Sequence, residues 1–165
     1  MEECISFKNM NCPVYLKRFS PEDIIEVEEL EKRTFEVGPY NREELEELLT
    51  MPDTFNFLLY DEKSHELLGY IAASKIDEVT ANIESIAVDP RYQGKGAGTA
   101  LLNAIEQEMK ARKYIFSILE VREMNMGALE FYKSKGYEEG ELLKNFYTLS
   151  YKGSNHGIRL IKKLT

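Results

Sequence analysis

Three glycines at every second position, Gly94, Gly96 and Gly98, separate an apolar segment from one with helical periodicity. Glycine tolerates positive φ angles and lets another molecule approach the main chain closely. Successive N–H groups of such a turn, with the N-terminus of a following helix, stabilise a bound phosphate. The spacing therefore predicts a loop that binds a phosphate compound.

Two well-known phosphate-binding patterns do not fit this loop. A Walker A loop has its lysine directly after the last glycine, whereas Lys95 lies between the first two glycines. In the dinucleotide pattern G-x-G-x-x-G, Thr99 stands where the third glycine belongs. The hexapeptide QGKGAG, residues 93–98, instead fits [Q/R]-x-x-G-x-[G/A] between a strand and a helix, which is typical of acyl-coenzyme A loops.

Two carboxylates lie inside apolar segments, Glu120 in SILEV and Glu84 in NIESIAV. Burying a carboxylate is costly without a partner or a purpose, and desolvation raises its pKa toward a value that suits a general base. Glu120 is the candidate base, with an ion pair to Arg122 on the same strand as the structural alternative. Glu84 is the rival base, acting directly or through water.

The elements that must position these groups have clear boundaries. Ser20, Pro21 and Asp23 predict the start of a first helix, and Asn41 with Glu44 predicts the start of a second. The whole pattern predicts an α/β (α+β) fold with the order β-α-α-β-β-β-α-β-α-β-β. We expect a mixed, mostly antiparallel seven-stranded sheet flanked by about four helices, and one domain over residues 1–165.

Composition narrows the classes of function. A net charge of −8 and the lack of a basic stripe argue against nucleic acid as a partner. No apolar run is long enough to span a membrane, and the N-terminus lacks the features of a secretory signal. Cys4 and Cys12 make neither a zinc site nor a disulfide framework, which favours a reduced, cytoplasmic protein. His65 and His156 lie far apart in the sequence, so no metal is expected.

Three segments, VEELEKRTFEVGPYNREELEELL, IESIAVDPRYQGKGAGTALL and LEVREMNMGALEFYKSKGY, carry a resemblance to a known family. The chain resembles the GNAT superfamily of N-acetyltransferases, and within it the RimI-like branch and the archaeal protein N-terminal acetyltransferases. The resemblance covers nearly the whole chain. Two departures concern the acceptor side: SNHG stands where RimI-like enzymes usually carry an acidic pair, and the chain has no tryptophan.

The resemblance implies acetyl-CoA as co-substrate and assigns roles to residues. Tyr132, twelve residues after Glu120, is implied as the general acid that meets the leaving thiolate, close to the thioester sulfur. The implied cofactor-binding residues are Ile86, Ala87, Val88, Gln93, Gly94, Lys95, Gly96, Ala97, Gly98, Thr99, Asn125 and Tyr132. The implied acceptor-binding residues are Glu36, Val37, Tyr40 and Tyr147.

Three functions remain open on the sequence alone. The first is acetylation of the α-amine of a protein or peptide N-terminus, by direct attack with a general base and a general acid. The second is acetylation of a small amine, such as a polyamine or an aminoglycoside. This agrees with eleven acidic against three basic residues in segment 20–50. The third is a non-catalytic acetyl-CoA-binding module. The expected assembly is a monomer or a homodimer.

Overall fold

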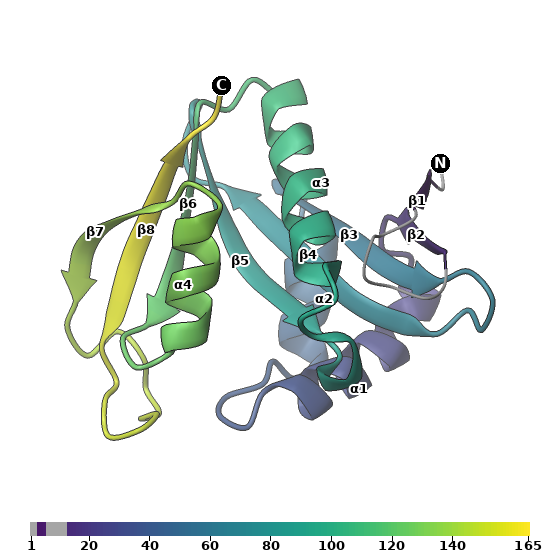
Figure 1. Cartoon of the computed structure of the whole chain (residues 1–165), viewed down its shortest axis with the longest axis horizontal. Helices are drawn as coiled ribbons and strands as arrows, with labels where there is room; N and C mark the ends of the chain where they lie inside the picture. The colour runs from purple at the N-terminus through teal and green to yellow at the C-terminus, as the bar shows by residue number, and fades with distance from the viewer. Residues whose placement is uncertain (1–2, 6–12) are drawn as a thin grey trace.

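The computed structural model describes the backbone of residues 3–5 and 13–165 and the side chains of residues 13–165. A mixed sheet forms the centre of the molecule, with α1 and α2 on one face and α3 and α4 on the other (Figure 1). Cys12 lies outside the described residues and Cys4 is described for its backbone alone, so the prediction about the two thiols stays a prediction.

The predicted order of elements is confirmed. A short strand β1 precedes the seven predicted strands, so the described sheet has eight strands in the order β1-β2-β3-β4-β5-β6-β8-β7. The elements are β1 Glu3–Ile5, β2 Val14–Lys17, the 3₁₀ turn η1 Pro21–Asp23, α1 Ile24–Thr34, α2 Arg42–Thr50, β3 Thr54–Asp61, β4 Leu67–Lys75, β5 Thr80–Val88, the 3₁₀ turn η2 Pro90–Tyr92, α3 Ala97–Ala111, β6 Phe116–Arg122, α4 Met126–Ser134, β7 Glu138–Leu143 and β8 Gly157–Lys163.

The two predicted helix starts are present. Ser20 N–H donates to Asp23 Oδ2 at 2.8 Å, and Pro21 opens the short turn that leads into α1. Glu44 N–H donates to Asn41 Oδ1 at 2.9 Å, while Asn41 N–H donates to Glu44 Oε1 at 3.2 Å. These bonds satisfy N–H groups that have no partner inside the helix. α2 begins where the sequence predicts, whereas α1 begins at Ile24, after a 3₁₀ turn that starts at the predicted Pro21.

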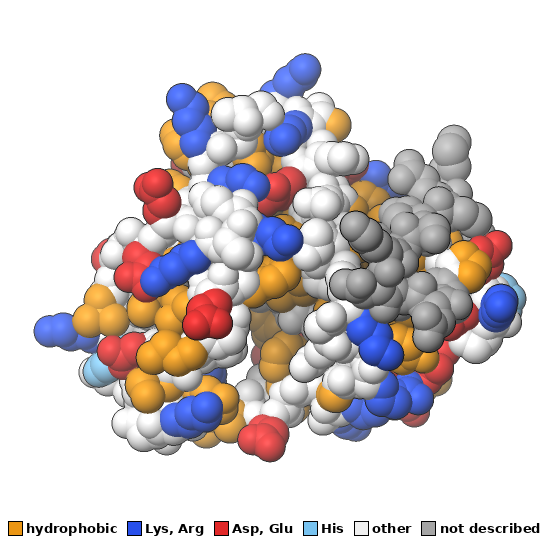
Figure 2. Space-filling view, viewed as in Figure 1, with side chains coloured by type: hydrophobic (Ala, Val, Ile, Leu, Met, Phe, Trp, Pro, Cys, Tyr) orange, Lys and Arg blue, Asp and Glu red, His pale blue; other side chains and the backbone are white. Residues whose placement is uncertain are grey.

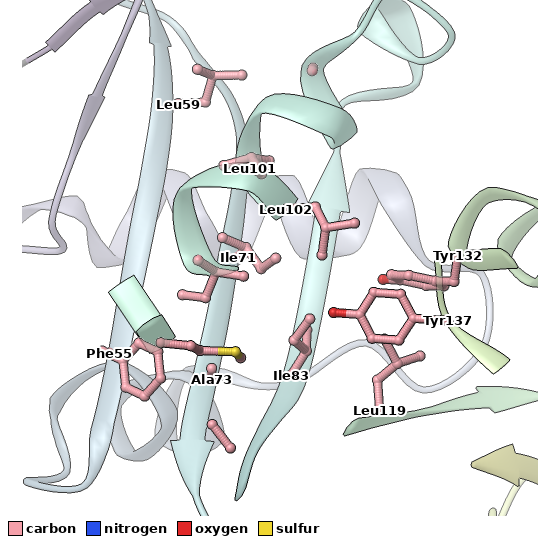
Figure 3. Close-up of a cluster of buried hydrophobic side chains, with 14 of the residues drawn as sticks. Phe55, Leu59, Ile71, Ala73, Ile83, Leu101, Leu102, Leu119, Tyr132 and Tyr137 are labelled. Atoms are coloured by element: carbon pink, nitrogen blue, oxygen red, sulfur yellow. The ribbon is translucent and has the colours of Figure 1, made fainter. Parts of the chain in front are cut away.

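The core has one hydrophobic cluster on each face of the sheet. On the α3 and α4 face, Leu101, Leu102 and Ile105 of α3 pack onto β3, β4 and β5, each at most 1% exposed (Figure 3). On the other face, Val27 and Leu30 of α1 pack with residues of α2, β3 and β4. Burial of each large aliphatic side chain contributes about 1.5–3 kcal/mol, so these clusters fix the helices on the sheet.

The parallel strands β5 and β6 separate within the sheet. They pair over four residues, from Thr80 opposite Phe116 to Ile83 opposite Leu119. Beyond this point both strands continue, to Val88 and Arg122, without further pairing to each other among the described residues. On its other side β5 stays paired with β4, with a bulge that leaves Glu84 as the extra residue between two pairs. The fold therefore opens beside the central strand.

The described residues contain no helix that is long and apolar enough to cross a membrane.

Candidate active site

A cavity of about 1070 Å³ opens where β5 and β6 separate. Figure 2 shows it as a hollow in the lower middle of the face that carries α3 and α4. The end of α1 and the loop after it form one wall, the glycine loop another and α4 a third. The lining residues are Arg33, Thr34, Phe35, Glu36, Val37, Ile86, Val88, Pro90, Gln93, Gly94, Gly96, Gly98, Thr99, Arg122, Asn125, Gly127, Ala128, Phe131, Tyr132 and Tyr151.

The main chain of β5 presents an open edge to this cavity. Asp89 N–H donates to Leu68 O of β4 at 2.8 Å. Since the polar groups of successive strand residues point to opposite sides, those of Ile86 and Val88 point away from β4, toward the gap. Gln93 Nε2 donates to Val88 O at 3.0 Å, which agrees with this direction. Ile86 and Val88 line the cavity, whereas Ala87 is 1% exposed and packs on the opposite face.

The glycine loop has the geometry that an anion site requires. Gly94 and Gly96 adopt φ angles of 74° and 95°, and no atom lies within 4 Å of where their Cβ atoms would be. Gly96 begins α3 without a capping side chain, and the first turn of α3 holds no acidic residue. The free N–H groups and the helix dipole therefore favour an anion.

Two predicted loop residues do not line the cavity. Ala97 is 1% exposed in the core, and Lys95 places its Nζ 5.7 Å from the centre of the Tyr92 ring.

Asn125, just before α4, and Tyr132, within α4, both line the cavity. Asn125 is the N-cap of this helix, because its Oδ1 accepts from Ala128 N–H at 3.2 Å. Tyr132 is 5% exposed, and its ring packs edge-on against Phe131 and Tyr137 at centroid distances of 5.1 and 5.6 Å. Figure 3 shows Tyr132 and Tyr137 side by side, with their hydroxyls on the same side. Burial raises the pKa of Tyr132, so its hydroxyl keeps its proton at neutral pH.

Glu84 and Glu120 lie directly after the last pairing of β5 with β6, where the two strands begin to separate. Neither belongs to the cavity lining. Ser74 Oγ donates to Glu84 Oε1 at 2.5 Å. Because Ile83 pairs with Leu119, Glu84 and Glu120 are neighbours across the two strands, and the charge of Glu84 contributes to a raised pKa of Glu120.

Glu120 forms an ion pair, but with a different partner from the one expected. Its Oε1 lies 3.3 Å from Nη2 of Arg159, the residue opposite it on β8. Arg122 instead donates to Leu149 O at 2.7 Å and lies 4.1 Å from the centre of the Tyr147 ring. Burial raises the pKa of Glu120, and Arg159 opposes this rise. The structural alternative of an ion pair therefore has Arg159 as its partner, because β8 brings Arg159 beside Glu120.

Of the four predicted acceptor residues, two line the cavity and two lie outside its lining. Glu36 and Val37 form part of the wall after α1. Tyr40 O–H donates to Glu84 O at 3.4 Å, and burial, reinforced by the charge of Glu84, raises the pKa of Tyr40 to about 12. Burial also raises the pKa of Tyr147 to about 12, against the effect of Arg122 and with that of Glu120. Tyr40 therefore contacts the main chain at Glu84, and Tyr147 packs against Arg122 of β6.

Some cavity residues escape reasoning from the sequence. Arg33, at the end of α1, lines the cavity and lies 3.1 Å from Asp89, a 1% exposed carboxylate that Arg91 also contacts. Tyr151 lines the cavity from the segment between β7 and β8, and Arg159 of β8 reaches Glu120 through strand register. The basic residues of GIRLIKK within a strand are a signal that a cross-strand partner exists, but they do not identify it.

The two histidines have local roles. Tyr15 Oη lies 3.3 Å from Nδ1 of His65, and His156 Nδ1 accepts from Asn145 N–H at 2.9 Å. In the described part of the chain, no group of three or more His, Cys, Asp or Glu side chains is placed to hold a metal ion.

Comparison with known proteins gives consistent matches. Residues 24–137 match the model of the acetyltransferase (GNAT) family. An uncharacterised N-acetyltransferase of Methanocaldococcus jannaschii is 32% identical over 150 residues, 90% of each chain. The [ribosomal protein bS18]-alanine N-acetyltransferase of Escherichia coli K12 is 39% identical over 82 residues. This match spans about half of each chain, 48% of this one and 55% of the relative.

A solved structure shares the fold. The crystal structure of the ribosomal-protein-S18-alanine N-acetyltransferase from Escherichia coli superposes with a TM-score of 0.82 at 24% identity. It covers 92% of this chain and 94% of that one.

Proposed function

The chain belongs to the acetyltransferase (GNAT) family, and from that membership we propose that it is an acetyl-CoA-dependent N-acetyltransferase. The proposed acceptor is the α-amine of a protein or peptide N-terminus. The partial similarity to the bS18-alanine N-acetyltransferase supports a protein acceptor. We take residues 1–165 as one cytoplasmic domain that works as a monomer or a homodimer.

The residues of the cavity fit coenzyme A. Its pantetheine arm contains amide groups, and the open edge of β5 at Ile86 and Val88 offers main-chain partners for them. Its diphosphate fits the N–H groups between Gly94 and Thr99, at the uncapped start of α3. Since Arg33 and Arg122 also line the cavity, they offset part of the repulsion between an anionic cofactor and the acidic chain.

In the proposed reaction, different residues handle the proton of the acceptor amine and the proton of the leaving thiol. Acetyl-CoA supplies the acetyl group as a thioester. Glu120, or Glu84 in its place, accepts the proton of the acceptor ammonium, so that the amine nitrogen can form its bond to the carbonyl carbon. Tyr132 donates its proton to the sulfur as the carbon–sulfur bond breaks, and the proton that the newly acylated nitrogen must lose restores the tyrosine hydroxyl.

One observation carries the proposal: the open edge of β5, the uncapped start of α3 and Tyr132 of α4 all border one cavity. In the described residues, the Tyr132 hydroxyl makes no hydrogen bond to the protein. Because Tyr132 lines the cavity, a bound ligand or water can reach this hydroxyl. The position of this hydroxyl therefore supports a role toward a bound substrate.

The proposal is tested in two steps. Isothermal calorimetry with acetyl-CoA measures binding, and a chromogenic assay of thiol release then measures turnover with a panel of amines. The panel holds peptides with free N-termini, the same peptides with blocked N-termini, spermidine and an aminoglycoside. We expect acetyl-CoA binding and turnover with the free peptides alone. Binding without any turnover would support the non-catalytic module instead, and an absence of binding would refute the proposal.

The acidic segment 20–50 gives little support to the alternative of a small-amine acceptor. Several of its carboxylates already have cationic partners, as in the ion pairs of Glu28 with Arg42 and of Asp23 with Lys17, at 3.1 and 2.8 Å. Because these charges are neutralised locally, they add little to a field that would attract a polyamine. Turnover of spermidine above that of the peptides would nevertheless decide in favour of this alternative.

A further inference from the structure

Glu31 is a fully buried carboxylate on α1. It lies one helical turn after Val27, on the face that packs against the sheet, and its exposed fraction is 0%. In the described part of the chain, no lysine, arginine or histidine forms an ion pair with it. An apolar residue would be the ordinary choice at such a position, since burial of a carboxylate without a cation is expensive. A specific use of the carboxylate would explain its presence.

Three donors converge on this carboxylate from different parts of the fold. Tyr70 of β4 donates its hydroxyl proton to Glu31 Oε1 in a short hydrogen bond, and Ser85 Oγ of β5 lies 3.4 Å from the same atom. Tyr40 N–H, in the loop between α1 and α2, donates to Oε2 at 3.2 Å. All three partners can donate, so together they can stabilise the ionised carboxylate, which only accepts. Burial raises the pKa of Glu31, and the three donors oppose this effect.

The contact with Tyr40 connects Glu31 to the acceptor side of the site. Tyr40 is held at two points: its N–H by Glu31 and its hydroxyl by the main-chain oxygen of Glu84. Glu84 is the bulged residue of β5, and Ser85 follows it directly. Glu31 therefore holds both the loop and the strand segment that the loop must face. The same loop begins with Phe35, Glu36 and Val37, which line the cavity.

We propose that Glu31 is a positioning residue that ties the α1–α2 loop to β5 and thereby sets the affinity for the acceptor amine. It touches neither substrate. This inference rests on the proposed function, because that proposal assigns Glu36, Val37 and Tyr40 to acceptor binding. Without the carboxylate the loop leaves its docked position for part of the time, and the apparent affinity for the acceptor falls in proportion to the docked fraction.

The test uses Glu31→Leu, which removes both acceptor oxygens, and Glu31→Gln, which keeps one. Glu29→Gln is the matched control, since Glu29 is an exposed glutamate on the same helix. One hydrogen bond to a charged group is worth about a tenfold change in an equilibrium. We therefore expect Glu31→Leu to raise the acceptor KM about tenfold and to change the affinity for acetyl-CoA much less. Glu31→Gln should fall between, and Glu29→Gln should match the unaltered protein.

Hydrogen exchange at the Tyr40 amide gives a readout that needs no activity. We expect it to accelerate about tenfold in Glu31→Leu and to stay slow in Glu29→Gln. Tyr70→Phe provides a second comparison, because it removes a buried donor but leaves the bond between Glu31 and Tyr40 N–H. It should lower thermal stability with the Tyr40 amide still protected. If Glu31→Leu does not fold, Glu31→Gln takes its place. The Tyr40 amide should then exchange faster in Glu31→Gln than in Tyr70→Phe.

Unchanged Tyr40 exchange and an unchanged acceptor KM in a folded Glu31→Leu protein would overturn the inference. So would equal acceleration of Tyr40 exchange in Tyr70→Phe, since that would show a general loss of stability. Failure of the proposed function looks different: the unaltered protein would acetylate no amine, while the exchange measurements would still report whether Glu31 holds the loop.

Discussion

Replacement of Arg159 by methionine should shift the pH dependence of catalysis. Arg159 Nη2 lies 3.3 Å from Glu120 Oε1, and its positive charge counteracts the rise that burial causes in the pKa of Glu120. Asn82 also lowers this pKa, whereas the charge of Glu84 raises it. Arg159→Met removes the cation that lowers this pKa, so the pKa of Glu120 should rise further.

The expected size of the shift follows from the contacts of Arg159. A neighbouring opposite charge within about 4–6 Å changes the pKa of a carboxyl group by about 1–3. The Arg159 side chain is 35% exposed, and its Nη1 also lies 3.4 Å from Glu141 Oε2, so solvent and a second carboxylate share its charge. The lower end of the range applies, about one pH unit.

The assay is the pH profile of kcat/KM for the acceptor, followed by thiol release. If Glu120 is the base, the acidic limb moves to higher pH by about one unit, and the rate on that limb falls about tenfold. At high pH, where Glu120 is ionised in both proteins, the rates converge. Arg159→Lys keeps a cation, so its pH profile should show little of this shift. Glu141→Gln should also change the profile little.

An unmoved acidic limb in a folded Arg159→Met protein would refute the assignment of Glu120 as the base. Glu84 would then be the stronger candidate, because its contact with Ser74 does not involve Arg159. A tenfold loss at every pH, without a shift, would also contradict the reasoning, since it would indicate a geometric role of the arginine.

Three further predictions concern the cofactor side. Gly96→Ala should raise the calorimetric Kd for acetyl-CoA about tenfold, because φ is 95° there and a side chain in the left-handed region costs about 1–2 kcal/mol. Tyr132→Phe should lower kcat about 100-fold and leave the Kd for acetyl-CoA nearly unchanged, if its hydroxyl is the general acid; an unaltered kcat would exclude that role. Asn125→Ala removes the N-cap of α4 at a cost of about 1 kcal/mol, and a thermal melt should show a midpoint lower by about 2–4 °C.

The sequence predicts the fold well because its signals are local. Asn41 caps α2 as predicted, and Ser20 caps the 3₁₀ turn that leads into α1. The helical spacing of Leu101, Leu102 and Ile105 identifies the buried face of α3. Both kinds of signal depend on residues a few positions apart, so they need no knowledge of the tertiary structure. The short strand β1 carries no comparable signal in its three residues.

The candidate site is predicted only where it is made of one continuous segment. The glycine loop can be read from consecutive residues, and Gly94 and Gly96 have the positive φ angles that such a loop needs. The partner of Glu120 cannot be read in this way, because Arg159 is 39 positions away and reaches it through the pairing of β6 with β8. The role of the buried Glu31 cannot be predicted from the sequence for the same reason, because its donors come from three separate parts of the fold.

The open edge of β5 has a consequence for the behaviour of the protein in solution. An unpaired strand edge is a template for any extended chain, and natural sheets usually cover or charge such edges. Here the edge of β5 faces the open cavity between β5 and β6, where a bound extended arm would cover it. Concentrated protein without coenzyme A should therefore be more prone to self-association than protein with it, and the ligand would act as a solubiliser as well as a reactant.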